Sequence, residues 1–259
     1  MKAIDIFKDE KFIECLKYNT YNNKDRKTKI FNNKDEIIEE NINKITKIIC
    51  PNCWITNIDG IHIFINLEIL RLYNNKIKKI PKEIWKLKNL KIISLINNQI
   101  EKLPKEIGKL KNLEILSISN NKIERLPKEI SKLKKLEELY LIFNQIKELP
   151  EGIGKLTNLK GLNLSYNQLQ RLPEEILKLN KLQRIWLYKA FDLNNLKQKP
   201  KELLDILKKL KDNNVFDDFD LKYLEEEVYP VLAEKIKRKY KITDLKQIKD
   251  NLNLDNLNF

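Results

Sequence analysis

Residues 90–112 read LKIISLINNQIEKLPKEIGKLKN, and this stretch decides the fold because its pattern returns every 23 residues. An asparagine recurs in phase at Asn75, Asn98, Asn121, Asn144 and Asn167. A proline keeps the same step at Pro81, Pro104, Pro127, Pro150 and Pro173. Leucine or isoleucine fills the apolar positions between them. A fixed period of this length, kept over five consecutive copies, is typical of a solenoid of stacked repeats.

Each unit combines a strand pattern with a helical one. The alternation of Leu70 and Leu72 has the period of a strand with one buried face. Ile80 and Ile84 are four residues apart, which predicts a helical or 3₁₀ return segment that faces the same core. Pro81 suits the start of that segment, since its missing N–H is no loss at a first helical position.

The recurring asparagines are interpreted as structural residues. A buried amide can donate to one backbone carbonyl and accept from a backbone N–H, so it satisfies polar groups that the bend would leave unpaired. Five of them in phase between apolar positions predict a ladder inside the stack. One repeat cannot bury its own apolar face, so the terminal units need caps.

The unit L-x-x-[LI]-x-[LI]-x-x-N-x-[IL]-x-x-[IL]-P-x-x-I-x-x-L-x-x resembles the 23-residue leucine-rich repeat class of Ras-suppressor and Scribble-type proteins and of many bacterial repeat proteins. The resemblance implies an α/β fold, a right-handed solenoid with a curved parallel sheet on its concave side and short helical or 3₁₀ turns on its convex side. It also implies a protein partner. A small GTPase is the class that the Ras-suppressor likeness suggests, yet no residue here selects one.

The expected organisation has three parts. Residues 1–44 form a helical N-terminal cap with a polar loop, and residues 45–190 form the solenoid. Within the solenoid, 45–66 is a degenerate first repeat, 67–181 holds five regular repeats, and 182–190 is a partial last repeat. Residues 191–259 form a helical C-terminal cap.

The N-terminal part is predicted from apolar spacing. An apolar stripe over residues 4–17 predicts a helix that docks on something, residues 18–35 read as a polar loop, and residues 35–42 read as a short helix. At the C-terminal end, a helix is expected from Pro200 to Leu210. Another is expected from Leu221 to Ile236, kinked or broken near Pro230, and a last short helix at 243–248.

The pair Cys50 and Cys53 has the C-x-x-C spacing, so metal and redox sites are weighed against a structural role. A zinc site needs four ligands, and beyond this pair the chain supplies only Cys15 and His62, which are distant in sequence. A shift of 22 residues places Cys50 on the core position of Leu72 and Cys53 on the asparagine position. We therefore expect a degenerate repeat, no metal, and a His62 without a catalytic role.

Composition bounds the remaining possibilities. The 259-residue chain has a formal net charge of +14, with many lysines mixed with glutamates in the return segments. A solvated surface is favoured over a nucleic-acid footprint. No signal peptide is visible, no run reaches the roughly 20 apolar residues of a membrane span, and the odd count of cysteines favours a reducing compartment. A cytoplasmic monomer without a cofactor is expected.

The concave side offers the candidate binding site. Residues between the buried leucines point to that side, and in the C-terminal half they are unusually aromatic. Tyr, Trp and Arg are types that anchor protein interfaces. The predicted partner-binding residues are Tyr140, Ile142, Phe143, Tyr166, Trp186, Tyr188, Glu138 and Arg184. The alternative that the C-terminal helices cover this patch remains open.

These observations predict a non-catalytic protein–protein interaction scaffold with a role in signalling or host interaction. The sequence has only five glycines, and it shows no phosphate-binding loop, no paired-carboxylate cleft and no set of nucleophile and base. An enzyme is therefore not expected. The alternative function is a basic nucleic-acid-binding or adaptor protein that uses the Lys-rich convex face or the C-terminal helices.

Overall fold

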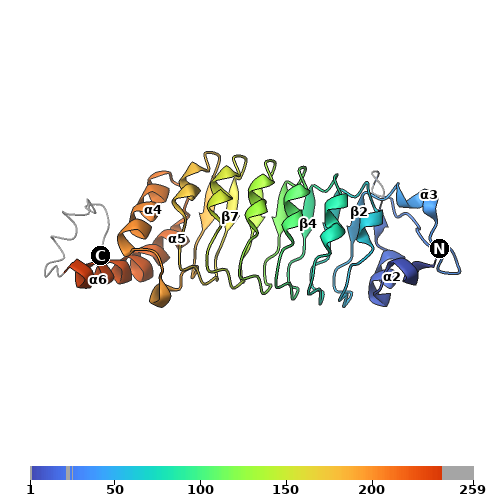
Figure 1. Cartoon of the computed structure of the whole chain (residues 1–259), viewed down its shortest axis with the longest axis horizontal. Coiled ribbons are helices and arrows are strands. Elements are labelled where there is room, and N and C mark those ends of the chain that lie inside the picture. The colour runs from blue at the N-terminus through green and yellow to red at the C-terminus, as the bar shows by residue number, and fades with distance from the viewer. Residues whose placement is uncertain (1, 22–23, 25, 241–259) are drawn as a thin grey trace.

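The computed structural model describes residues 2–21, 24 and 26–240. These residues form an elongated stack of coils, with the N-terminal elements at one end and α4 to α6 at the other (Figure 1). Short helices lie over the strands along one side of the stack. The predicted solenoid is thus confirmed.

The strands form one sheet whose order follows the chain. β1 (Thr20–Tyr21) is antiparallel to β2, and the remaining pairs are parallel. The parallel strands are β2 (Lys47–Ile49), β3 (Ile69–Arg71), β4 (Ile92–Ser94), β5 (Ile115–Ser117), β6 (Glu138–Tyr140), β7 (Gly161–Asn163) and β8 (Arg184–Trp186). From β3 onward, each residue pairs with the one 23 positions later, whereas Ile48 pairs with Leu70, as the 22-residue shift of the first repeat predicts.

The return segments are 3₁₀ helices, one in each repeat. They are η1 (Ile61–Ile63), η2 (Lys82–Lys86), η3 (Lys105–Lys109), η4 (Lys128–Lys132), η5 (Glu151–Lys155), η6 (Glu174–Lys178) and η7 (Leu193–Asn195). In η2 to η6 a proline precedes the first residue, with φ between −62° and −69°. Proline fixes φ near this value, so the recurring proline sets where each helix begins.

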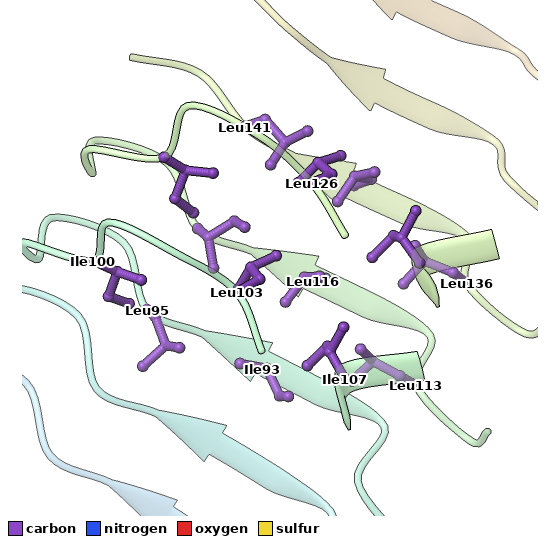
Figure 2. Close-up of a cluster of buried hydrophobic side chains, with 14 of the residues drawn as sticks. Ile93, Leu95, Ile100, Leu103, Ile107, Leu113, Leu116, Leu126, Leu136 and Leu141 are labelled. Atoms are coloured by element: carbon purple, nitrogen blue, oxygen red, sulfur yellow. The ribbon is translucent and has the colours of Figure 1, made fainter. Parts of the chain in front are cut away.

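The core lies between the strands and the 3₁₀ helices. Figure 2 shows Ile93 and Leu116 from two neighbouring strands close to Ile107 from η3. All three side chains are at most 2% exposed. The same positions are buried in every regular repeat, so one continuous core runs through the stack.

The phased asparagines form the hydrogen bonds of a buried ladder. Asn98 Nδ2 donates to the carbonyl oxygens of Leu72 at 2.9 Å and of Leu95 at 3.1 Å, and its Oδ1 accepts from Ile77 N at 3.0 Å. Asn75, Asn121, Asn144 and Asn167 repeat this pattern, and all five side chains are buried. Each amide therefore joins its own turn to the preceding one.

The N-terminal part differs in detail from the sequence-based expectation. The single helix over 4–17 is wrong, because the chain forms α1 (Ala3–Ile6) and α2 (Glu10–Leu16). Asp9 separates them: its Oδ1 caps α2 through Phe12 N at 2.9 Å, and its Oδ2 accepts from Thr56 N at 2.7 Å. The polar loop contains β1, and the short helix is reduced to α3 (Glu39–Ile42).

The C-terminal helices are α4 (Pro200–Asp212), α5 (Asp218–Tyr223) and α6 (Tyr229–Tyr240). A π-helical turn, Leu224–Val228, joins α5 to α6 without a break. Tyr229 N donates to Leu224 O, five residues back, just before Pro230, which has no N–H to donate. The expected disturbance near Pro230 is therefore a widened turn. The helix expected at 243–248 lies outside the described residues.

Both edges of the sheet are covered. β1 covers β2 at one edge. At the other edge, Ile185 N donates to Val215 O at 2.9 Å, and Leu187 N donates to Asp220 Oδ1 at 2.8 Å. In the regular repeats the equivalent N–H groups bond to the next strand. At β8, Val215 and Asp220 supply the acceptors that a next strand would otherwise provide.

Candidate functional site

The candidate site lies on the face of the sheet that points away from the 3₁₀ helices, which we call the concave face. Along each strand the first and third residues point to this face, because the middle residue is buried in the core. In β4 and β5 the third residues are Ser94 and Ser117, whereas in β6 and β8 they are Tyr140 and Trp186. Aromatic area on this face thus increases toward the C-terminal half.

Tyr140 and Trp186 come together across β7. Their ring centroids are 6.3 Å apart, with Asn163 between them in the register of the sheet. The Arg184 guanidinium lies 5.5 Å from the Trp186 ring, where it can make a cation–π contact. Burial, together with a hydrogen bond to Glu138, raises the pKa of Tyr140, so its hydroxyl stays protonated.

Gly161 makes room for this cluster. A Cβ atom at this position would collide with the Glu138 carboxylate, which therefore lies over the glycine. In the register of the sheet, Glu138 and Arg184 lie on either side of Gly161 in β7. One cluster accordingly offers two aromatic rings with one anionic and one cationic group.

A second set of aromatics lies along the turns that follow the strands. In the N-terminal half this row is asparagine, with Asn97 Nδ2 donating to Asn74 Oδ1 at 2.8 Å and Asn120 Nδ2 to Asn97 Oδ1 at 3.0 Å. Phe143 and Tyr166 take over the next two positions, and their rings stack with centroids 4.2 Å apart. The exposed asparagine ladder therefore changes into an exposed aromatic stack.

The backbone at these two aromatics is left-handed. φ is 55° at Phe143 and 53° at Tyr166, close to the 55° of Asn97. Asparagine tolerates this conformation through its short polar side chain, whereas bulky residues in it are uncommon. The two rings also stay in solvent, with 49% of Phe143 and 36% of Tyr166 exposed.

The C-terminal helices contact only one end of the aromatic row. The Tyr188 ring lies 5.3 Å from Tyr166 on one side and 4.4 Å from Phe219 and 5.2 Å from Tyr223 of α5 on the other, measured between centroids. Phe143 and Tyr166 remain exposed beside them. Ile142 is half-buried in the same row of the concave face as Tyr188. Within the described residues, the cap extends the patch rather than covering it.

The lysines at the ends of the 3₁₀ helices lie on a different edge. Lys111 Nζ donates to Lys132 O at 3.1 Å and Lys134 Nζ to Lys155 O at 2.6 Å. Burial and the neighbouring lysines lower the pKa of Lys111. These side chains thus hydrogen-bond the last carbonyl groups of the neighbouring 3₁₀ helices. This role supports the interpretation of this edge as a solvated structural surface.

No metal site is found in the part of the chain that the structure describes, where no group of three or more His, Cys, Asp or Glu side chains could hold an ion. His62 lies in η1, where burial lowers its pKa below the ordinary value. Cys50 is buried in the core at the position of the second strand leucine. None of the described helices combines the length and apolar character that crossing a membrane requires.

Sequence reasoning named the exposed aromatics but missed two features of their setting. It did not identify the left-handed row, although the repeated pair of asparagines at 74–75, 97–98 and 120–121 is the signal that could have found it. It also missed Phe219 and Tyr223, because a helix outside the repeat has no register that ties it to the strands.

Comparisons with known proteins agree on the class of fold. The leucine-rich repeat region family matches residues 50–144 and 105–256, which together span most of the chain. Among curated proteins, none matches the chain. The chain therefore belongs to the leucine-rich repeat family.

Three solved structures illustrate the likeness. A leucine-rich repeat protein of Leptospira interrogans is 39% identical over 58% of this chain and 43% of its own, with a TM-score of 0.43. The ectodomain of the Arabidopsis thaliana membrane receptor kinase GASSHO1/SCHENGEN3, solved with CASPARIAN STRIP INTEGRITY FACTOR 2, is 33% identical over 52% and 17%, with a TM-score of 0.49. An internalin (inlF) of Listeria monocytogenes is 21% identical over 70% and 56%, with a TM-score of 0.53. The chain thus spans about half or less of the length of each.

Proposed function

We propose that this protein is a non-catalytic scaffold that binds another protein through the C-terminal half of its concave face and the adjoining turns. The binding surface consists of Tyr140, Ile142, Phe143, Tyr166, Trp186 and Tyr188, with Glu138 and Arg184 beside them. We call this surface the aromatic patch. An exposed apolar patch of this kind on a concave surface is typical of a partner-binding site.

The exposed stack of Phe143 on Tyr166 carries the proposal. Both residues stand at left-handed positions that the preceding repeats fill with asparagine, and neither ring contributes to the core. A bulky residue there costs roughly 1–2 kcal/mol relative to a relaxed backbone. Stability alone therefore does not account for these aromatics, whereas binding of a partner does.

The composition of the patch supports a protein as the ligand. Tyrosine and tryptophan provide large contact areas with few rotatable bonds, and arginine adds a directional charge, which are the properties of interface hot spots. Glu138 and Arg184 place opposite charges within one cluster, so the partner should pair apolar side chains with both a basic and an acidic group.

The first test truncates the strand cluster. Tyr140→Ala combined with Trp186→Ala should abolish capture of the partner from an extract of the native host, because both rings of the cluster are lost. The melting temperature should stay nearly unchanged, since both side chains lie outside the core. Tyr73→Ala is the matched control, as it removes an aromatic from the same face in the N-terminal half. Retention of the same captured proteins by the double variant would refute the site.

The second test restores asparagine to the turn row. Phe143→Asn combined with Tyr166→Asn should weaken partner capture by about tenfold or more, because the exposed stack is removed. The free energy of unfolding should be equal to or higher than that of the wild type, since asparagine accepts the left-handed backbone. Binding curves and urea unfolding measure the two effects separately. Undiminished binding by this variant would show that the partner does not contact the stack.

A further inference from the structure

Four aromatic rings form a continuous row that extends past the last strand of the sheet into α5. The Tyr166 ring lies 4.2 Å from Phe143 and 5.3 Å from Tyr188, and the Tyr188 ring lies 4.4 Å from Phe219, measured between centroids. We call these four residues the ring row. Phe219 is 61% exposed, so the far end of the row is also in solvent. Because its members come from successive coils and the cap, the ring row follows the long axis of the stack.

The polar atoms of the row and its surroundings include hydrogen-bond donors without acceptors. Within the described part of the chain, the hydroxyls of Tyr166 and Tyr188 and the indole N–H of Trp186 have no hydrogen-bond partner. Covering such donors without an acceptor is costly, so buried Tyr and Trp groups are usually paired. A ligand that covers these rings therefore has to supply acceptors of its own.

Free backbone carbonyl groups would supply them, and peptide conformations differ in how many they offer. A β-strand binds by adding to a sheet edge, but β1 covers one edge here, and Val215 and Asp220 cover the other. An α-helix uses its carbonyls internally except in its last turn. A polyproline II segment has no internal hydrogen bonds and leaves its whole backbone solvated. It therefore provides the most acceptors.

The spacing of the large side chains favours the same conformation. β6 and β8 carry large residues where β7 has small ones. The three rows are Tyr140–Asn163–Trp186, Ile142–Ser165–Tyr188 and Glu138–Gly161–Arg184. Neighbouring strands are about 4.8 Å apart, so β6 and β8 are about 9.6 Å apart. One three-residue turn of polyproline II advances about 9.3 Å, whereas two residues of a β-strand advance about 6.6 Å. Only the former matches the alternation of large and small residues.

The charge beside the rings indicates a basic group on the ligand. Glu138 is half-buried, its carboxylate lies over β7, and no cation pairs with it within the described residues. The Arg184 guanidinium lies over the Trp186 ring instead. By contrast, the neighbouring Glu137 pairs with Lys160 Nζ at 2.7 Å. Because a carboxylate covered by a ligand needs a counter-ion, the ligand should place a basic side chain at Glu138.

We propose that the partner docks on the ring row through a proline-rich segment in the polyproline II conformation, with a lysine or arginine beside Glu138. This inference rests on the proposed function, which it narrows to one class of segment. Proline rings pack on aromatic side chains, and the preformed conformation loses little entropy on binding. The backbone carbonyls of the segment accept hydrogen bonds from Tyr166, Tyr188 and Trp186.

The test begins with a selection that favours no conformation. Random dodecapeptides displayed on phage are selected on the full chain, and the Phe143→Asn, Tyr166→Asn double variant serves for counter-selection. We expect the peptides that only the wild type retains to carry prolines three residues apart and a basic residue. Selected peptides that lack this spacing, or equal recovery on the two proteins, would overturn the proposal.

Phe219 provides a test of the ring row outside the strands. The most enriched peptide is labelled with fluorescein, and its affinity is measured by fluorescence polarisation. Phe219→Ala should weaken binding about tenfold, because it removes one end of the row. Ile65→Ala is the matched control, since it truncates an exposed apolar side chain in the N-terminal half. An affinity that Phe219→Ala leaves unchanged would contradict the proposed course of the segment.

Glu138→Gln tests the charge contact. The wild type should bind the selected peptide about tenfold more tightly than a peptide with glutamine in place of its basic residue, whereas Glu138→Gln should bind the two equally. Glu137→Gln removes a neighbouring carboxylate and should keep the preference. A preference that Glu138→Gln also keeps would show that the basic residue does not lie at Glu138.

The outcomes separate this inference from the proposed function. If Tyr140→Ala with Trp186→Ala abolishes capture of the host partner, but the selection yields no proline-rich peptide, the patch binds a protein of another shape and only the inference fails. If that double variant retains the partner, the proposed function fails and the inference with it.

Discussion

At the residue scale, the buried asparagine of each repeat joins successive turns of the solenoid by hydrogen bonds. Its amide bonds to carbonyl groups of two successive turns and accepts an N–H from the earlier one. Each of these two carbonyls also accepts from a neighbouring asparagine of the ladder, whereas the N–H of Ile100 has only the Asn121 amide oxygen as its hydrogen-bond partner. An apolar side chain of similar size would therefore leave that N–H unpaired and take one of two bonds from each carbonyl.

Asn121→Ala tests this role directly. The substitution leaves Ile100 N without its partner and takes one of two asparagine bonds from Leu95 O and Ile118 O. It should lower the free energy of unfolding by about 1–3 kcal/mol. Lys122→Ala, at the exposed neighbouring position, is the control and should change it by less than about 0.5 kcal/mol. Urea denaturation provides both values. Equal midpoints for the two variants would argue against the ladder.

Asp220 gives the C-terminal cap a dependence on pH. Its carboxyl is buried, and desolvation raises its pKa to about 6, although Leu187 N donates to it. An unfolded aspartate has a pKa near 3.9. Between these values the folded protein binds the proton and the unfolded chain does not. The stability contributed by this group is therefore present below about pH 4 and is lost as the pH rises to about 6.

Asp220→Asn should remove that dependence, because the amide keeps an acceptor for Leu187 N and cannot ionise. The free energy of unfolding of the variant relative to the wild type should increase between pH 4.5 and pH 7. Urea titrations at several pH values measure this difference, in which the other titrating groups cancel. A difference that does not vary with pH would show that Asp220 titrates normally in the folded protein.

The residues of the aromatic patch could be predicted from the sequence, but the arrangement of their rings could not. Tyr140 and Trp186 were predicted to face the same side because strands alternate, and the structure places their rings 6.3 Å apart. The stack of Phe143 on Tyr166 depends on a left-handed turn. That turn has no apolar period, so only its asparagine content hints at it.

At the element scale, neighbouring return segments pack closely against one another. Gly108 in η3 and Gly154 in η5 lie against the backbones of Glu129 and Glu175 in the following repeats. A Cβ atom at either glycine would overlap that backbone, not a flexible side chain. The spacing of the coils thus restricts side-chain size at this position in these two repeats.

Gly108→Ala should accordingly destabilise the protein by about 1–3 kcal/mol, the usual cost of overpacking. Ser131→Ala is the matched control, because Ser131 holds the same position in η4 and its side chain is already accommodated. Urea unfolding again measures both, and circular dichroism checks that the 3₁₀ content is kept. A Gly108→Ala protein as stable as the wild type would show that the coils can separate without cost.

Elements inside the repeat could be predicted well, and those outside it less well. Five copies of one pattern reinforce each other, so the register of β3 to β8 follows from the sequence alone. The caps occur once each. The break between α1 and α2 depends on Asp9 reaching Thr56, and the π-helical turn lies where the buried Tyr229 precedes Pro230. Local spacing carries no information about such long-range contacts.

At the scale of the whole molecule, the residues that stabilise the solenoid are largely different from those of the proposed binding surface. The core, the asparagine ladder and the two covered sheet edges hold the solenoid together, and of the aromatic residues of the patch only Tyr188 also packs against the core. The patch lies instead on a rigid wall beside the C-terminal cap, with Tyr188 in contact with Phe219. A preformed surface of this kind loses little conformational entropy when a partner binds.

Hydrogen–deuterium exchange of the chain with and without its captured partner tests the central claim most directly. Because backbone amides report the place of contact, binding at the aromatic patch should protect residues 138–143, 161–166 and 184–189, and leave η2 to η4 unchanged. Protection confined to the lysine-bearing ends of the 3₁₀ helices, with unchanged exchange in β6 to β8, would contradict binding through the concave face.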